Sequence, residues 1–193
     1  MNAESVAALG AAGMCVGAGT AVLLTRTGAA VPRWAVIAGT GAAWAAASAT
    51  VGVSGTTWLP ALLVLTGLAV PLVAADLRHR RLPDILTLPA YPLVLATAPH
   101  PGAALLGAVV FGGAHLLVHL LRPRAMGAGD VKLAGALGAV LGGIGWLAYP
   151  AAAVLAALVT TGLAATRRWR DGVPHGPGLL VATTTLAALH VPP

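Results

Sequence analysis

The sequence predicts an all-α fold, a polytopic membrane bundle of about eight transmembrane helices with both termini outside. The first observation is composition: of 193 residues, 58% are hydrophobic and 8% are charged, and the mean hydropathy is +0.89. A soluble domain carries about 25% charged residues, so most of a soluble surface would lack polar cover. The second observation is that the apolar residues occur in successive runs. The third is that connections with basic residues alternate along the chain with connections that have none. We therefore treat residues 1–193 as a single transmembrane domain.

The apolar runs define the expected helices in order. They lie at residues 5–25, 34–53, 57–75, 85–98, 102–121, 131–147, 149–166 and 178–191. A perpendicular crossing takes about 20 residues, so most runs are long enough, whereas the fourth and the last are short. Residues 133–166 are too many for one crossing, and Tyr149-Pro150 is a natural break. The count is eight, with seven as the alternative.

The basic residues predict the orientation. All eleven lie in the first, third, fifth and seventh connections or at their edges: Arg26, Arg33, Arg78, Arg80, Arg81, Arg122, Arg124, Lys132, Arg167, Arg168 and Arg170. Short loops rich in Lys and Arg stay on the cytoplasmic side, so these four connections are expected there and both termini outside. The net charge of +6 is then an orientation signal, and no nucleic-acid partner is expected.

Two of the five acidic residues stand out by position. Asp76 directly follows the third run and Asp130 directly precedes the sixth, so both are expected at the cytoplasmic face. Each also has a simpler interpretation. Asp130 could cap a helix N-terminus, and Asp76 could pair with Arg78 or Arg80 in water. An ionisable residue at a membrane helix is nevertheless a functional hypothesis, because burying it is costly.

The sequence around these acids contains three short motifs. Residues 127–130 read G-A-G-D, with glycines that permit close backbone approach, and V-K-L follows. Residues 76–84 read D-L-R-H-R-R-L-P-D, an acid followed by a basic loop and a proline that restarts a helix. Residues 174–178 read P-H-G-P-G and open the last run.

These three motifs, in this order and on one membrane face, resemble those of the type IV prepilin peptidase (leader peptidase) family of GxGD aspartic membrane peptidases. The resemblance covers about residues 70–185, whereas residues 1–65 add N-terminal spans of unclear role. It implies that Asp76 and Asp130 are catalytic. The residues implied to support them are Gly127, Gly129, Lys132, Pro83, Asp84, Gly176 and Pro177. The sequence departs from the family pattern at His175 and Gly178, where the family commonly has aromatic residues.

The resemblance also implies an activity. The expected substrate is a prepilin or pseudopilin, whose short basic leader precedes a hydrophobic helix that stays in the lipid bilayer. Cleavage would occur at the cytoplasmic face of a bacterial cytoplasmic (inner) membrane, with the Asp dyad activating water and with no metal or cofactor. Cys15 is the single cysteine, so the chain resembles a short form without the cysteine-containing methyltransferase insertion.

Two other classes of function stay open as alternatives. Another GxGD intramembrane protease, of the presenilin kind, would place its first aspartate beside Tyr and carry a Pro-Ala-Leu segment. Here Ala75-Asp76-Leu77 and Gly176-Pro177-Gly178 stand instead. A polytopic transporter would carry polar residues near mid-membrane, where this sequence offers only His115 and His119.

Overall fold

The computed structural model describes residues 2–51, 57–124, 126–166, 169 and 172–190, and these residues form eight helices and no strand. The helices are α1 (Ala3–Arg26), α2 (Arg33–Thr50), α3 (Leu59–His79), α4 (Asp84–Thr97), α5 (Pro101–Leu121), α6 (Ala128–Ile144), α7 (Ala148–Ala165) and α8 (Gly176–His190). Each corresponds to one predicted apolar run. The all-α prediction is therefore confirmed, and the break at Tyr149-Pro150 lies at the start of α7.

Four of the helices, α1, α3, α5 and α7, are long and apolar enough to cross a membrane. Within the described residues, the other four do not meet the same criterion of length and hydropathy. Helix α4 has 14 residues and contains Pro89 and Pro92. At 1.5 Å per residue it reaches about 21 Å, less than the roughly 30 Å of a hydrocarbon core. The protein is thus a helical membrane bundle in which helices that meet the criterion alternate along the chain with helices that do not.

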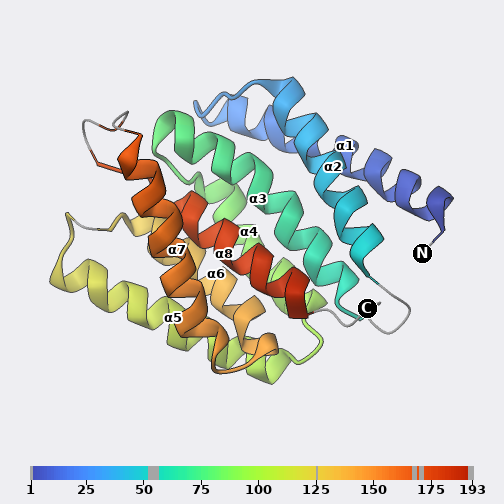
Figure 1. Cartoon of the computed structure of the whole chain (residues 1–193). Coiled ribbons are helices and arrows are strands. Elements are labelled where there is room, and N and C mark those ends of the chain that lie inside the picture. The colour runs from blue at the N-terminus through green and yellow to red at the C-terminus, as the bar shows by residue number, and fades with distance from the viewer. Residues whose placement is uncertain (1, 52–56, 125, 167–168, 170–171, 191–193) are drawn as a thin grey trace.

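The described basic connections gather at one end of the bundle. Figure 1 shows the α1–α2, α3–α4 and α5–α6 connections and the start of α8 on the left, while α1 begins and α8 ends on the right. Arg167, Arg168, Arg170 and Asp171 lie outside the described residues. The alternation read from the sequence thus corresponds to a real grouping in space. Which end faces the cytoplasm stays a prediction.

Glycines allow two helix pairs to pack at backbone contact. Helix α5 packs most extensively against α6, and α1 against α2. A Cβ placed on Gly107 of α5 would collide with the carbonyl oxygen of Gly138 on α6, and one on Gly142 with that of Ala103. Small residues permit this approach in membrane helices, where dispersion contacts between surfaces drive association.

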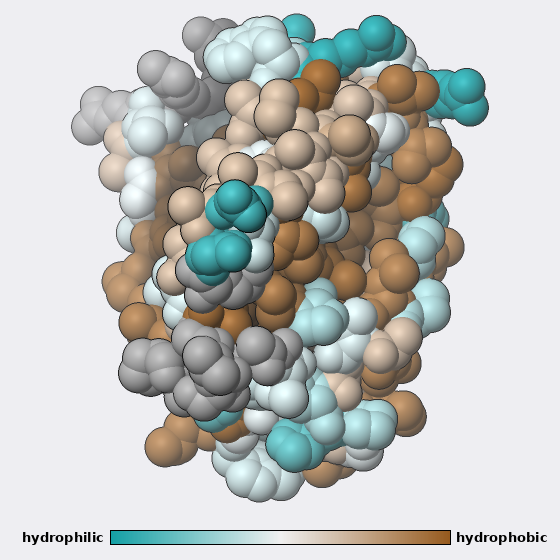
Figure 2. All heavy atoms as spheres, turned by 90° about the vertical axis from the view of Figure 1, so that its right-hand side faces the viewer, coloured by the Kyte–Doolittle hydropathy of each residue, from teal (hydrophilic) through white to brown (hydrophobic). Residues whose placement is uncertain are grey.

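Helix α6 lies at the centre and α5 at the periphery. All residues from 133 to 141 of α6 are buried, and α6 packs against α4, α5, α7 and α8. The outer face of α5, by contrast, exposes large aliphatic side chains, namely Leu105, Leu106, Val109, Val110, Leu116, Leu117, Val118, Leu120 and Leu121. Figure 2, which looks onto the right-hand side of Figure 1, shows further apolar residues at the surface beside hydrophilic ones. Such surfaces suit lipid contact.

Candidate active site

The main chain presents Asp76 at the end of α3. Asp76 lies in the last turn, and the helix ends at Arg80, whose backbone is left-handed (φ 53°, ψ 41°). The Arg80 N–H donates to the carbonyl oxygen of Asp76 at 2.8 Å, which closes the helix terminus. This cap ends the helix one turn after the acid, at the start of the basic loop.

The side chain of Asp76 is buried, with 5% of its surface exposed. Its Oδ2 accepts a hydrogen bond from the backbone N–H of Gly176, 100 residues later, at 3.1 Å. This contact forms because α8 packs against α3. Asp76 is therefore not exposed to water, since its carboxyl group lies inside the bundle, and Arg80 interacts with it electrostatically.

Asp130 occupies the first turn of α6. Gly127 is the N-cap of that helix and Asp130 is its third residue, so the N-cap interpretation of Asp130 is wrong by three positions. Asp130 Oδ2 instead accepts from the Gly127 N–H at 3.2 Å. A carboxylate there satisfies an otherwise unpaired N–H and interacts favourably with the helix dipole. The contact is local, and the side chain is only half-buried.

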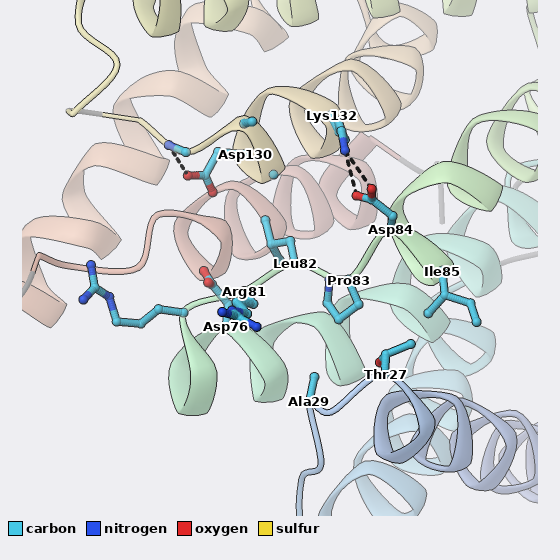
Figure 3. A pocket seen from close by; sticks show the side chains of 14 residues that line it. Thr27, Ala29, Asp76, Arg81, Leu82, Pro83, Asp84, Ile85, Asp130 and Lys132 are labelled. Carbon is cyan, nitrogen blue, oxygen red and sulfur yellow. Dashed lines mark hydrogen bonds and ion pairs between the residues drawn. The ribbon is translucent and has the colours of Figure 1, made fainter.

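The two acids face the same cleft, which has a volume of about 570 Å³. Its lining residues are Thr27, Ala29, Asp76, Arg80, Arg81, Leu82, Pro83, Asp84, Ile85, Gly127, Ala128, Gly129, Asp130 and Lys132. Figure 3 shows Asp76 and Asp130 on opposing walls, with Leu82 between them. The carboxyl groups are close enough to interact electrostatically. The side chain of Leu82 also packs close to Gly129 and Gly176. A Cβ added to either glycine would lie 3.2 Å from the nearest Leu82 side-chain atom.

Helix α4 fixes the far side of the cleft to α6. Lys132 Nζ contacts both carboxylate oxygens of Asp84, at 2.8 and 2.9 Å. The Tyr91 hydroxyl donates to the backbone oxygen of Lys132 at 2.7 Å. Since α4 also packs against α3, these contacts connect the helix of Asp130 to the helix of Asp76.

Two histidines and a threonine lie behind Asp130. His175, just before α8, shares a hydrogen bond between its Nδ1 and Thr160 Oγ1 of α7, at 2.9 Å. Its ring centroid lies 6.5 Å from that of His115 on α5. Burial lowers the pKa of His175 below its usual value, while the nearby Asp130 carboxylate opposes this shift and His115 adds to it. Neighbouring residues 175 and 176 therefore interact with different acids, His175 with Asp130 and Gly176 with Asp76.

The remaining histidines of interest bind backbone carbonyls. His115 Nδ1 donates to Phe111 O and His119 Nδ1 to Met126 O, both at 2.8 Å. His79 Nε2 donates to Ala30 O at 2.7 Å and thereby ties the end of α3 to the α1–α2 connection. In the described part of the chain, no group of three or more His, Cys, Asp or Glu is arranged to hold a metal ion.

The structure brings most of the expected site residues together. The cleft includes Asp76, Asp130, Gly127, Gly129, Lys132, Pro83 and Asp84. Gly176 reaches it through its bond to Asp76, whereas Pro177 is buried in the first turn of α8 and does not line it. The sequence motifs do not indicate Thr27 and Ala29, which come from the α1–α2 connection. Their local sequence does not indicate a functional site, because only the packing of α1 brings these two residues to the cleft.

The arrangement has the parts needed for hydrolysis by a pair of acids. Two carboxyl groups, one in the last turn of α3 and one in the first turn of α6, face one cleft of about 570 Å³. Carboxyl groups in such a pair resist ionising together, so one can keep a proton and donate while the other accepts. Both acids are oriented by backbone N–H groups, which hold them without introducing another titratable side chain.

Comparisons with known proteins agree with this geometry. A model of the type IV leader peptidase family matches residues 62–165, a range that contains both acids. The prepilin leader peptidase/N-methyltransferase of Dickeya chrysanthemi is 38% identical over 133 residues. The match covers 61% of this chain and 45% of that relative, so the chain spans less than half of its length. No solved structure matches this chain.

Proposed function

Because the chain belongs to the type IV leader peptidase family, we propose that it is a membrane aspartic endopeptidase. Its substrates are prepilins or pseudopilins, from which it removes the short basic leader at the cytoplasmic face of the inner membrane. The observation that carries the proposal is the convergence of Asp76 and Asp130 on one cleft at the end of the bundle where the basic connections gather. The relative's printed name, which includes prepilin leader peptidase, supports the substrate class.

The chemistry follows from the two carboxyl groups. The ionised partner takes a proton from a water molecule while the protonated partner donates a hydrogen bond to the scissile carbonyl oxygen. The oxygen of that water bonds to the carbonyl carbon and gives a tetrahedral intermediate. The C–N bond then breaks as the departing nitrogen receives a proton from the dyad. The products are the leader with a new carboxylate and the shortened chain with a new amine.

The position of the cleft suits a substrate that stays in the membrane. The acids lie at the end of α3 and the start of α6, so a cut there requires only the leader and the scissile bond to leave the hydrocarbon region. The substrate's apolar helix keeps its backbone hydrogen bonds within lipid. The proposal covers the peptidase activity alone, since the two acids account for hydrolysis.

Cleavage of a prepilin in detergent or nanodiscs tests the proposal. We expect Asp76→Asn and Asp130→Asn each to lower kcat by about 10³-fold, because an amide cannot exchange the proton that the reaction needs. Glu4→Gln is the matched control: it makes the same change at an exposed residue in the first turn of α1, and full activity is expected. A folded single variant of either cleft acid with near wild-type turnover would refute the dyad.

A further inference from the structure

An apolar groove runs from the cleft along the N-terminal helices. It lies between α1 (residues 16–23), α3 (residues 63–68) and α4 (residues 85–93), with Trp44 of α2 beside them, and has a volume of about 360 Å³. We call it the α1–α4 groove. None of the described residues that line it is charged, and Leu93 at its rim is 46% exposed. The groove is therefore an open apolar surface, unlike the cleft with its acids and bases.

The α1–α4 groove adjoins the cleft. Ile85 lines both, and it is the second residue of α4, directly after the cleft residues Pro83 and Asp84. The other wall continues in the same way, because α1 leads into Thr27 and Ala29, which also line the cleft. Both walls of the groove thus become walls of the candidate active site.

A second apolar groove provides a comparison. It lies on another side of α3, between α2, α3 and α8, and has a volume of about 470 Å³. We call it the α3–α8 groove. It shares none of its lining residues with the cleft. Size and apolarity alone would favour the α3–α8 groove, so the lining residue that the α1–α4 groove shares with the cleft, Ile85, is the observation that selects the smaller groove.

We propose that the α1–α4 groove binds the first turns of the substrate's apolar helix, on the side of the scissile bond that stays in the membrane. The inference rests on the proposed function and adds the place where that helix docks. Residues 85–93 of α4 rise by about 12 Å, which matches roughly two turns of a docked helix. The groove begins at Ile85, on the side of the cleft formed by Pro83 and Asp84, so a helix seated in it leads its preceding residues into the cleft that contains Asp76 and Asp130. The first N-terminal helix, outside the region matched by the family model, thereby acquires a role in substrate binding.

Crosslinking tests docking separately from cleavage. A photo-crosslinking residue is placed at Leu93, or at Val181 in the α3–α8 groove, which is 45% exposed and so closely matched. Both are made in the Asp76→Asn variant in nanodiscs, with an uncut prepilin as the probe. We expect substrate adducts from position 93 at about 10-fold the yield from position 181. Equal yields, or adducts to lipid alone from position 93, would overturn the inference.

Kinetics on the otherwise wild-type protein provide a second readout. Leu93→Trp fills the groove at its exposed rim, so we expect KM for prepilin to rise about 10-fold with kcat little changed, equivalent to about 1.4 kcal/mol of binding. Val181→Trp should leave both parameters unchanged. An unchanged KM in Leu93→Trp counts against the groove, whereas a wild type that cleaves no prepilin counts against the proposed function.

Discussion

The two acids of the cleft are held by opposite means. Asp130 is half-buried and accepts from the N–H of Gly127, three residues before it in the same turn. Asp76 is almost fully buried and accepts from the N–H of Gly176, on a different helix and 100 residues away. One acid is therefore positioned by its own turn and the other by the docking of α8 on α3. The position of Asp130 is thus determined locally, whereas the position of Asp76 depends on tertiary packing.

The largest effects are expected when a methyl group is added to the glycine that donates to each acid. A Cβ on Gly176 would lie 2.7 Å from Asp76 Oδ2, whereas a Cβ on Gly127 would lie 3.3 Å from Asp130 Oδ2. We expect Gly176→Ala to lower kcat by about 100-fold, because small displacements of a catalytic group cost that much, and Gly127→Ala to cost less than about 10-fold. Prepilin cleavage rates measure both.

Gly113→Ala is the control for these glycine variants, since a Cβ there meets nothing within 4 Å. Its activity should equal that of the wild type. If Gly127→Ala lowered kcat more than Gly176→Ala, the comparison would be reversed. The position of Asp130 in its own turn would then matter more for activity than the packing of α8 on α3.

The histidine beside Asp130 predicts a difference in pH dependence. The pKa of His175 is lowered by burial, so its cation exists only at acidic pH, where it favours the carboxylate form of Asp130. His175→Gln removes this cation, so the pKa of Asp130 should rise. We expect the acidic limb of kcat/KM to move to higher pH, while the activity at neutral pH changes little. The measurement is a profile from about pH 5 to about pH 8, the range in which histidine titrates.

His100→Gln serves as the control, because His100 is an exposed residue at the N-cap of α5. Its profile should overlay that of the wild type. If His175→Gln has the wild-type acidic limb as well, His175 has only a packing role beside Thr160.

The smallest effect is expected at the ion pair that joins α6 to α4. The side chains of Lys132 and Asp84 are 40% and 57% exposed. Exposed pairs contribute less than about 1 kcal/mol. A double-mutant cycle of Lys132→Ala and Asp84→Ala, measured by unfolding in detergent, should give a coupling free energy in that range. A coupling of several kcal/mol would show that this pair, and not α8, holds the two halves of the site together.

The sequence predicts much of this molecule because two of its signals are local. Apolar runs separated by basic or proline-containing connections define each helix, since a membrane helix satisfies its backbone within one segment. Asp130 is identifiable for the same reason, because its glycines and its helix start are adjacent in the chain. Pairing it with Asp76 required only that the basic connections share one end of the bundle.

The features that the sequence did not predict depend on packing between distant segments. The bond from Gly176 to Asp76 exists only when α8 lies against α3, and the contribution of Thr27 and Ala29 only when α1 lies beside the cleft. The hydrogen bond from His79 to Ala30 O likewise joins segments 49 residues apart in the chain. The spacing of residues in the sequence does not predict such contacts, because the packing of whole helices determines which residues meet.

The dependence of Asp76 on Gly176 has a consequence for biogenesis. Membrane helices enter the bilayer in chain order, and both acids are in place before α8 is synthesised. Until α8 inserts, Asp76 lacks its amide donor and the cleft lacks the segment that contacts both acids. The nascent chain therefore lacks the complete arrangement of the two acids until α8 has been made. Under the proposed function, proteolytic competence requires the synthesis of α8, so the order of the helices sets the time of activation.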